Sequence, residues 1–183
     1  MAIDQQRTIS NQQRSVHNAS VSTPAAGFAA DTYLVGSSCA IPSGLLQAKA
    51  KYRCRFNVVK TAAGVATPII NVRFGTAGSV ADASRGTLTF SAQTAVVDEG
   101  VFEVECVFRT VGSGTVAVVQ TVGQLRHRLS ITGLGVGTSE PEIATSAGFD
   151  STVANSIIGL SVNGGALAAW TIAIVSAELV NLL

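Results

Sequence analysis

Hydrophobic and polar residues alternate with a period of two in several segments of the chain. In residues 51–58 and 102–109 the even-numbered positions are apolar and most odd-numbered positions are polar. In residues 124–131 the odd-numbered positions are apolar or histidine. This period places one face of a strand against a core and the other in solvent, which is typical of antiparallel sheets. We therefore predict strands in these three segments.

Shorter strands are expected elsewhere, separated by glycine-rich turns. Asn163-Gly164-Gly165 lies between two apolar runs and suits a tight turn with positive φ. About eight strands in roughly 150 residues predict an all-β fold, an antiparallel two-sheet jelly-roll-like sandwich, with an open Greek-key sandwich as the alternative. The shorter candidates are residues 32–35, 69–74, 87–90, 115–122 and 157–162.

The last predicted strand, residues 170–180, is largely apolar on both faces. A strand covered on one face only would alternate, so either the sandwich or a neighbouring subunit is expected to cover its outer face, and we favour a subunit. A closed symmetric oligomer would also hide exposed strand edges. We therefore predict that an oligomer interface or the core contains Trp170, Ile172 and Leu179.

The first 30 residues differ in composition from the rest of the chain. They are rich in Gln, Asn, Ser, Thr and Ala, and their few apolar residues follow no period. Such a segment does not bury enough apolar area to fold alone. We predict an extended N-terminal arm over residues 1–30 and a sandwich domain over residues 31–183, with a disordered tail as the alternative for the arm. The arm is expected to bind a partner through Ile3, Arg7, Arg14 and Phe28.

Composition and charge narrow the classes of function. Charged residues make up 13% of the chain and hydrophobic residues 47%. The charged share is about half the usual ~25%, so part of the surface is expected to be buried against partners. A net charge of +1 gives no bulk attraction to nucleic acid or anionic membranes, and no apolar run is long enough for a transmembrane helix. The N-terminal residues lack the pattern of a secretion signal, so we expect synthesis in the cytoplasm.

Residues that commonly carry catalysis are sparse. His17 lies in the predicted arm, and His127 lies on the inward face of a strand, where a hydrogen-bonded core residue is expected rather than a general base. The chain has no Gly-x-Ser-x-Gly, Cys-x-x-Cys or His-x-His motif and no calcium-loop spacing. Glu103 and Glu105 share one face of a strand, where cross-strand arginines would neutralise them. The expected partners are Arg53, Arg55, Arg73 and Arg109. We predict no enzyme activity, no metal and no cofactor.

The three cysteines are Cys39, Cys54 and Cys106. Cys54 and Cys106 fall on the apolar faces of predicted strands, where cysteine acts as a small hydrophobic residue. A disulfide or an intermolecular link is the alternative.

Several stretches resemble small virion proteins of tailed bacteriophages, and together they cover about residues 31–183. They are residues 41–46 (IPSGLL), 51–56 (KYRCRF), 60–64 (KTAAG), 72–78 (VRFGTAG), 148–159 (GFDSTVANSIIG) and 162–165 (VNGG). The resemblance implies a β-sandwich module on the outside of virions, found in capsid decoration (cement) proteins and in tail or head appendages, often as trimers.

Two virion functions follow from this resemblance. The first is a decoration protein that forms a homo-oligomer, with a trimer favoured, and binds the major capsid protein or other virion proteins on the outer surface of the head. The alternative is a tail-fibre or baseplate appendage involved in host-surface attachment. A carbohydrate-binding module or hydrolase domain of a cellular protein is a third hypothesis, which the low aromatic content of 5% disfavours. Neither nucleic acid nor membrane is an expected partner.

Overall fold

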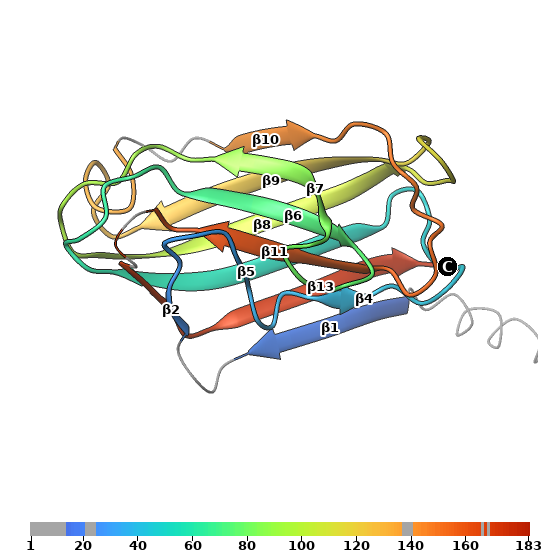
Figure 1. Ribbon diagram of the computed structural model, residues 1–183, viewed down its shortest axis with the longest axis horizontal. Helices are drawn as coiled ribbons and strands as arrows, with labels where there is room; N and C mark the ends of the chain where they lie inside the picture. The colour runs from blue at the N-terminus through green and yellow to red at the C-terminus, as the bar shows by residue number, and fades with distance from the viewer. Residues whose placement is uncertain (1–13, 21–24, 137–140, 166, 168) are drawn as a thin grey trace, which may run out of the picture.

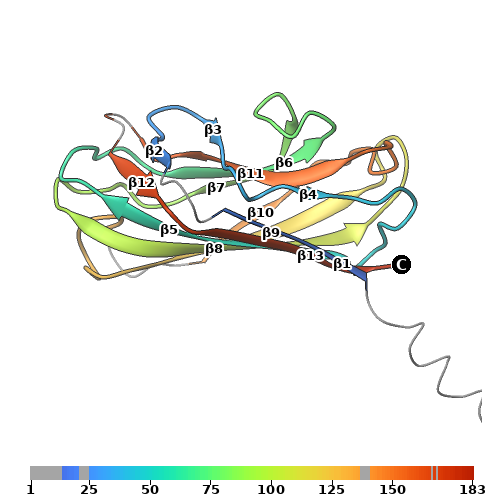
Figure 2. The same ribbon diagram turned by 90° about the horizontal axis from the view of Figure 1, so that it is seen from below.

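The computed structural model describes residues 14–20, 25–136, 141–165, 167 and 169–183. They form two antiparallel β-sheets packed face to face (Figures 1 and 2), so the predicted two-sheet sandwich is confirmed. Within these residues, no helix has the length and apolar character needed to cross a membrane.

The larger sheet has eight strands, with the order β1-β13-β5-β8-β9-β10 and with β12 and β2 continuing it beside β5. The smaller sheet has five strands, with the order β3-β11-β6-β7 and with β4 beside β11. The strands of the larger sheet are β1 (Arg14–Ser20), β2 (Ala25–Gly27), β5 (Lys51–Lys60), β8 (Asp98–Thr110), β9 (Val118–His127), β10 (Glu142–Thr145), β12 (Trp170–Ile172) and β13 (Val175–Leu182). Those of the smaller sheet are β3 (Thr32–Tyr33), β4 (Cys39–Ala40), β6 (Ile69–Gly75), β7 (Ala83–Thr89) and β11 (Ile157–Asn163).

The core lies between the two sheets and follows the predicted alternation. The even-numbered residues of β5 and β8 are buried from Tyr52 to Val58 and from Phe102 to Phe108. The register pairs Phe56 with Phe102, whose rings stack at 5.3 Å. The ring of Phe102 also lies 5.4 Å from that of Trp170, so β12 joins the same aromatic cluster. Residues chosen by period two thus form one continuous core.

Strand β9 differs from the prediction, because one strand replaces the two expected at residues 115–122 and 124–131. Gly123 lies inside it, where a side chain would collide with Leu88 of β7 and with Phe90, which follows that strand. The glycine therefore marks a close approach of the two sheets and not a turn.

The C-terminal segment also differs, because it contains a break that changes the phase of alternation. Side chains at even positions point inward in β12, whereas those at odd positions point inward from Val175 to Leu179. At the break, the Asn57 Oδ1 accepts hydrogen bonds from the backbone N–H groups of Ala173 (3.0 Å) and Ile174 (2.7 Å). The apolar character of both apparent faces thus arises from a phase shift between two successive strands, and it gives no indication of a subunit contact.

The described part of the predicted arm lies within the larger sheet. Strand β1 pairs with β13, and β2 pairs with β12, so this segment is extended but pairs with its own chain. Phe28 is buried in the core, which leaves it no surface for a partner and corrects its predicted role. Arg14 begins β1 and pairs through its backbone with Leu182. Residues 1–13, which include Ile3 and Arg7, lie outside the described residues.

Candidate interaction surface

Four connecting segments meet at one end of the sandwich, on the left in Figure 1, and we call this the loop end. They follow β5 (residues 61–68), β7 (90–97), β9 (128–136) and β11 (164, 165, 167 and 169 among the described residues). Strand pairing brings them together, because Lys60 at the end of β5 pairs with Asp98 at the start of β8. Buried polar side chains beneath these segments hold them in place.

Lys60 is the first of these side chains and is fully buried. Its Nζ donates hydrogen bonds to the carbonyl oxygens of Thr61 (2.8 Å), Thr94 (2.7 Å) and Val96 (3.2 Å). Burial lowers the pKa of Lys60, and the charge of nearby Asp98 opposes that shift. One ammonium group thus ties the segment after β5 to the segment after β7, using all three of its donors.

Asp98 is the second, and its side chain is sealed from solvent. Its carboxylate accepts hydrogen bonds from the backbone N–H groups of Leu134 (2.9 Å), Glu99 (2.9 Å) and Leu129 (3.3 Å). It also lies 2.7 Å from His127 Nδ1. Burial raises the pKa of Asp98, but the bonds from Leu134, His127 and Glu99 outweigh burial, so the pKa lies below its ordinary value. Asp98 therefore fixes the segment after β9.

Gln93, in the segment after β7, is the third, and it contacts the segments after β5 and β11. Its Nε2 donates hydrogen bonds to the carbonyl oxygens of Ala66 (2.8 Å) and Gly164 (2.6 Å). Its Oε1 accepts one from Trp170 Nε1 (2.7 Å). The loop end is therefore braced by buried hydrogen bonds from three side chains, which favours one conformation of the loops over many.

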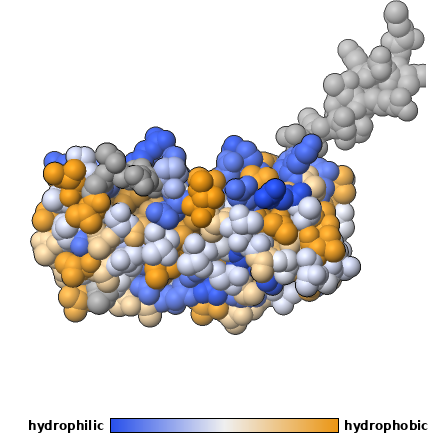
Figure 3. Space-filling model, turned by 90° about the horizontal axis from the view of Figure 1, so that it is seen from above, coloured by the Kyte–Doolittle hydropathy of each residue, from blue (hydrophilic) through white to orange (hydrophobic). Residues whose placement is uncertain are grey.

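Large apolar side chains project from the segments that this cluster holds. Leu167 is 72% exposed, Ile131 66% and Val97 61%. Hydrophobic residues are visible at the same end, on the left in Figure 3. Exposed apolar groups on a rigid, pre-organised support are typical of a protein-binding surface. The other large apolar residues exposed here are Val59, Val65, Val96 and Val136.

The stability of the loop end should depend on the ionisation of Asp98. Because its pKa is lowered in the folded state, its stabilising effect is complete above the unfolded-state pKa of roughly 4 and is lost as the pH falls through the folded-state pKa. We expect the difference in unfolding free energy between the wild type and Asp98→Asn to narrow in acid. Urea unfolding at several pH values between about 2 and 7 measures it. A difference that does not change with pH would contradict the assignment.

The residues predicted for the interface or core at the C-terminal end all lie in the core. Trp170, Ile172 and Leu179 are each at most 2% exposed. They therefore support the fold from inside the sandwich. The functional residues that sequence reasoning missed are Lys60 and Asp98. Lys60 could have been found, because a lysine at an inward, even position of a strand indicates a buried charge with partners. Asp98 gave no such signal, because the sequence pattern assigned it to a loop.

His127 is a hydrogen-bonded core residue, as predicted. Its side chain is 3% exposed, so the pair that it forms with Asp98 is shielded from dissolved substrates. Within the described part of the chain, no cluster of three or more His, Cys, Asp or Glu side chains is arranged to hold a metal. All three cysteines are buried and free, and burial raises the pKa of Cys39 to about 11 and those of Cys54 and Cys106 to about 12.

The outer face of the larger sheet is polar and charged. Glu105 contacts Arg53 (2.8 Å) and Lys51 (3.0 Å), and Glu103 contacts Arg55 (3.5 Å), as cross-strand pairing predicted. Burial raises the pKa of Glu105, but the bonds from Arg53 and Lys51 outweigh burial and lower it overall. Arg53, Arg55, Glu103 and Glu105 line an open hollow of about 480 Å³.

Two of the four arginines expected beside these glutamates lie elsewhere. Arg73 lies in the smaller sheet, where it pairs with Asp31. Arg109 lies at the far end of β8 and is exposed without an ion pair among the described residues. The pattern along one strand identified the outward face, whereas only the strand order shows which strands are neighbours.

Comparisons with known proteins give no family for the chain. No protein-family model and no curated protein matches it. Among solved structures, the CBM2 module of the evolved Dit protein of Lactobacillus casei BL23 phage J-1 aligns with a TM-score of 0.33 and 11% identity, over 79% of this chain and 68% of that one. A structure of the infectious bursal disease virus Gx strain aligns with a TM-score of 0.22 and 10% identity, over 94% of this chain and 43% of that one. TM-scores this low carry no argument about fold or function.

Proposed function

We propose that this chain is a structural protein of a virus particle, and specifically a decoration protein on the outside of a bacteriophage head. It would act by binding and not by catalysis. A protein that binds only the assembled shell stabilises that shell by mass action. Several copies bound at symmetric positions would add their effects through multivalency. The expected partners are the major capsid protein or other virion proteins and further copies of this chain.

The observation that carries this proposal is the loop end. Lys60, Asp98 and Gln93 fix loops whose tips expose large apolar residues, in a chain with only 13% charged residues. A surface of this kind loses little conformational entropy when a partner covers it. The virion assignment itself comes from the sequence stretches that resemble phage virion proteins.

Fewer residues of the N-terminal segment remain predicted partner contacts than the sequence suggested. Ile3, Arg7 and Arg14 stay predicted partner contacts, whereas Phe28 belongs to the core. Removal of residues 1–28 would delete β1 and β2 and would not test binding alone. The loop end therefore offers the cleaner test.

Aspartate at an exposed loop-end position should weaken particle binding without unfolding the chain. We expect Val97→Asp and Ile131→Asp each to weaken binding to purified virions about tenfold or more, because an unpaired charge would be buried at the contact. The unfolding free energy should change by no more than about 0.5 kcal/mol, since both side chains are exposed. Co-sedimentation with virions measures binding, and urea unfolding measures stability.

Val116→Asp is the matched control, because Val116 is 56% exposed in the turn before β9, at the opposite end of that strand from the loop end. It should bind as the wild type does. Equal loss of binding by Val116→Asp and Val97→Asp, or no loss by either loop-end variant, would overturn the assignment of the surface.

A tail-fibre or baseplate appendage is the second candidate, and the hollow on the outer face of the larger sheet favours it. That hollow presents guanidinium, carboxylate and amide groups, among them Arg55, Glu103 and Gln124, which are suited to a polar host-surface ligand. The number of copies per virion separates the two candidates. A ratio near that of the major capsid protein supports decoration, whereas a ratio lower by about one or two orders of magnitude supports an appendage.

A further inference from the structure

The edges of the two sheets meet along β7 and β10, at the top of Figure 1, and Figure 3 looks onto this side of the molecule. In the described part of the chain, β10 is the last strand of the larger sheet and β7 the last strand of the smaller one. Both strands therefore have one side without a paired neighbour among these residues. We call this side the β7–β10 edge.

Arg85 is an unpaired cation at this edge. The pairing of β6 with β7 shifts between Val72 and Arg73, so Arg85 is the extra residue of a β-bulge. Its guanidinium lies 4.5 Å over the ring of Phe149, and burial lowers its pKa. Its Nε is shielded from solvent without a hydrogen-bond partner, and the side chain has no ion pair with any described residue. A bulge that re-aims a charged side chain is typical of a functional position.

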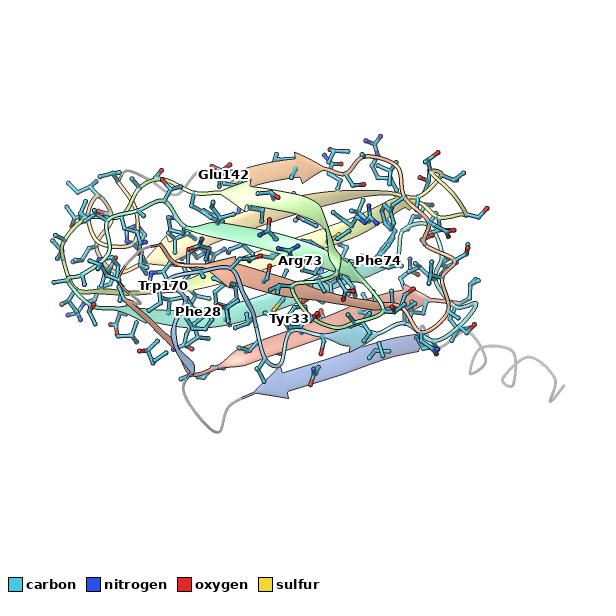
Figure 4. All side chains as sticks on the ribbon, in the orientation of Figure 1. Phe28, Tyr33, Arg73, Phe74, Glu142 and Trp170 are labelled. Atoms are coloured by element: carbon cyan, nitrogen blue, oxygen red, sulfur yellow. The ribbon has the colours of Figure 1, made fainter. Side chains whose placement is uncertain are left out.

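Glu142 is an unpaired anion at the same edge. It begins β10, as labelled in Figure 4, and is half-buried. It pairs through its backbone with Gly123, whose Cα faces Leu88 of the smaller sheet, so the Glu142 side chain points toward β7. Its carboxylate has no ion pair or hydrogen bond with the described residues.

Close contacts between the sheets show how far apart the two charges lie. A Cβ on Gly86 would meet Thr121, which pairs with Ala144, and a Cβ on Gly123 would meet Leu88. Arg85 therefore lies level with the end of β10, about three residues from Glu142. At ~3.4 Å per residue the separation is roughly 10 Å, too far for the two groups to neutralise each other within one copy.

The backbone of β10 has unused hydrogen-bonding groups on its outer side. The Ser146 N–H donates to the Val119 carbonyl oxygen (2.9 Å), so backbone groups at even positions of this segment face β9. By alternation, the N–H and C=O groups of Ile143 and Thr145 face outward. A second copy can lie antiparallel to β10 about a two-fold axis at Ala144. Ile143 of each copy then forms a hydrogen-bonded backbone pair with Thr145 of the other.

We propose that a second copy of this chain binds at the β7–β10 edge, with β10 antiparallel to β10 of the partner and Arg85 of each copy beside Glu142 of the other. The two-fold axis sets Glu142 of one copy opposite Ser146 of the second copy. Arg85 of that second copy lies beside its own Thr145, so it is one residue along the strand from Glu142 of the first copy. Each copy supplies a cation and an anion, so the contact is self-complementary. Ala144, which lies on the axis, has a side chain small enough for close approach.

This contact closes at two copies, so the free chain is a dimer where the resemblance implied a trimer. The inference rests on the proposed function only for the expectation that the chain self-associates. The contact pairs β10 of one copy with β10 of the other, so each copy loses one unprotected sheet edge.

Sedimentation velocity of the full chain tests the proposal through a charge swap. The wild type should dimerise, and Arg85→Glu or Glu142→Arg alone should raise the dimer dissociation constant about tenfold or more, because like charges then face each other. The double variant Arg85→Glu with Glu142→Arg should restore dimerisation, because the charges are complementary again. A purely structural role of either residue would not produce this rescue.

Two further variants keep the test independent of folding. Arg85→Gln retains much of the stacking on Phe149 and should weaken the dimer less than Arg85→Glu does. Thr145→Pro removes one outward N–H without removing a bond to β9 and should abolish the dimer, with far-UV circular dichroism unchanged. Arg109→Glu, a charge reversal at an exposed arginine on β8, should have no effect.

A wild type that is monomeric or trimeric would overturn the proposal, and so would single charge variants that dimerise normally or a double variant that is not rescued. Failure of the proposed function gives a different result. In that case the wild type would not bind virions, and the dimer of the free chain would be unaffected.

Discussion

Trp170→Ala is expected to lower the free energy of unfolding by about 3–5 kcal/mol, because it removes a fully buried indole from the centre of the core. The ring of Trp170 lies 5.4 Å from that of Phe102, and its Nε1 donates to Gln93. The variant leaves a cavity and also leaves the Gln93 Oε1 without its donor. Urea unfolding followed by far-UV circular dichroism measures the loss.

Trp170→Phe is the control that separates packing from hydrogen bonding. It should cost less than Trp170→Ala, because most of the ring volume is kept. The remaining loss of unfolding free energy, about 1–3 kcal/mol, comes from the Gln93 Oε1, which is left buried without a donor. Equal losses for the two variants would mean that the bond to Gln93 is the whole contribution of Trp170. A loss below about 1 kcal/mol for Trp170→Ala would contradict its place in the core.

Asp98→Ala is expected to cost about 3–5 kcal/mol, because it leaves Lys60 as a buried charge without its anion and removes the acceptor of Leu129, Leu134 and His127. The loss should be accompanied by faster amide hydrogen exchange in residues 128–136, since these residues lose their anchor. Urea unfolding and hydrogen exchange measure the two effects.

Glu99→Ala is the matched control for Asp98→Ala. Glu99 is the next residue, carries the same charge and pairs with Arg128 at 3.4 Å, but its side chain is 59% exposed. An exposed pair contributes little, so the expected loss is about 0.5 kcal/mol or less. Similar losses for the two variants would show that the buried position of Asp98 has no special effect.

The fold class and the inward face of the regular strands are predictable from the amino-acid pattern. Tyr52, Phe56 and Phe102 are buried as their period of two predicted, because burial of one face acts on every second residue of a strand. The alternation also identified the outward pairs of Glu103 and Glu105. Gly165, in the predicted turn after β11, has the positive φ of 91° that the sequence suggested. Such signals are local, so they are present in the sequence whichever segments pack against the strand.

Tertiary structure alone decided the features that depend on contacts between distant segments. The mostly polar β1 has no period, and only its pairing with β13 makes it a strand. The phase shift before Val175 depends on Asn57, more than a hundred residues earlier in the sequence. Lys60 and Asp98 are neighbours because β5 pairs with β8. Hydrogen bonds and charges between remote residues form only after the strands are ordered side by side, and no period along the sequence encodes that order.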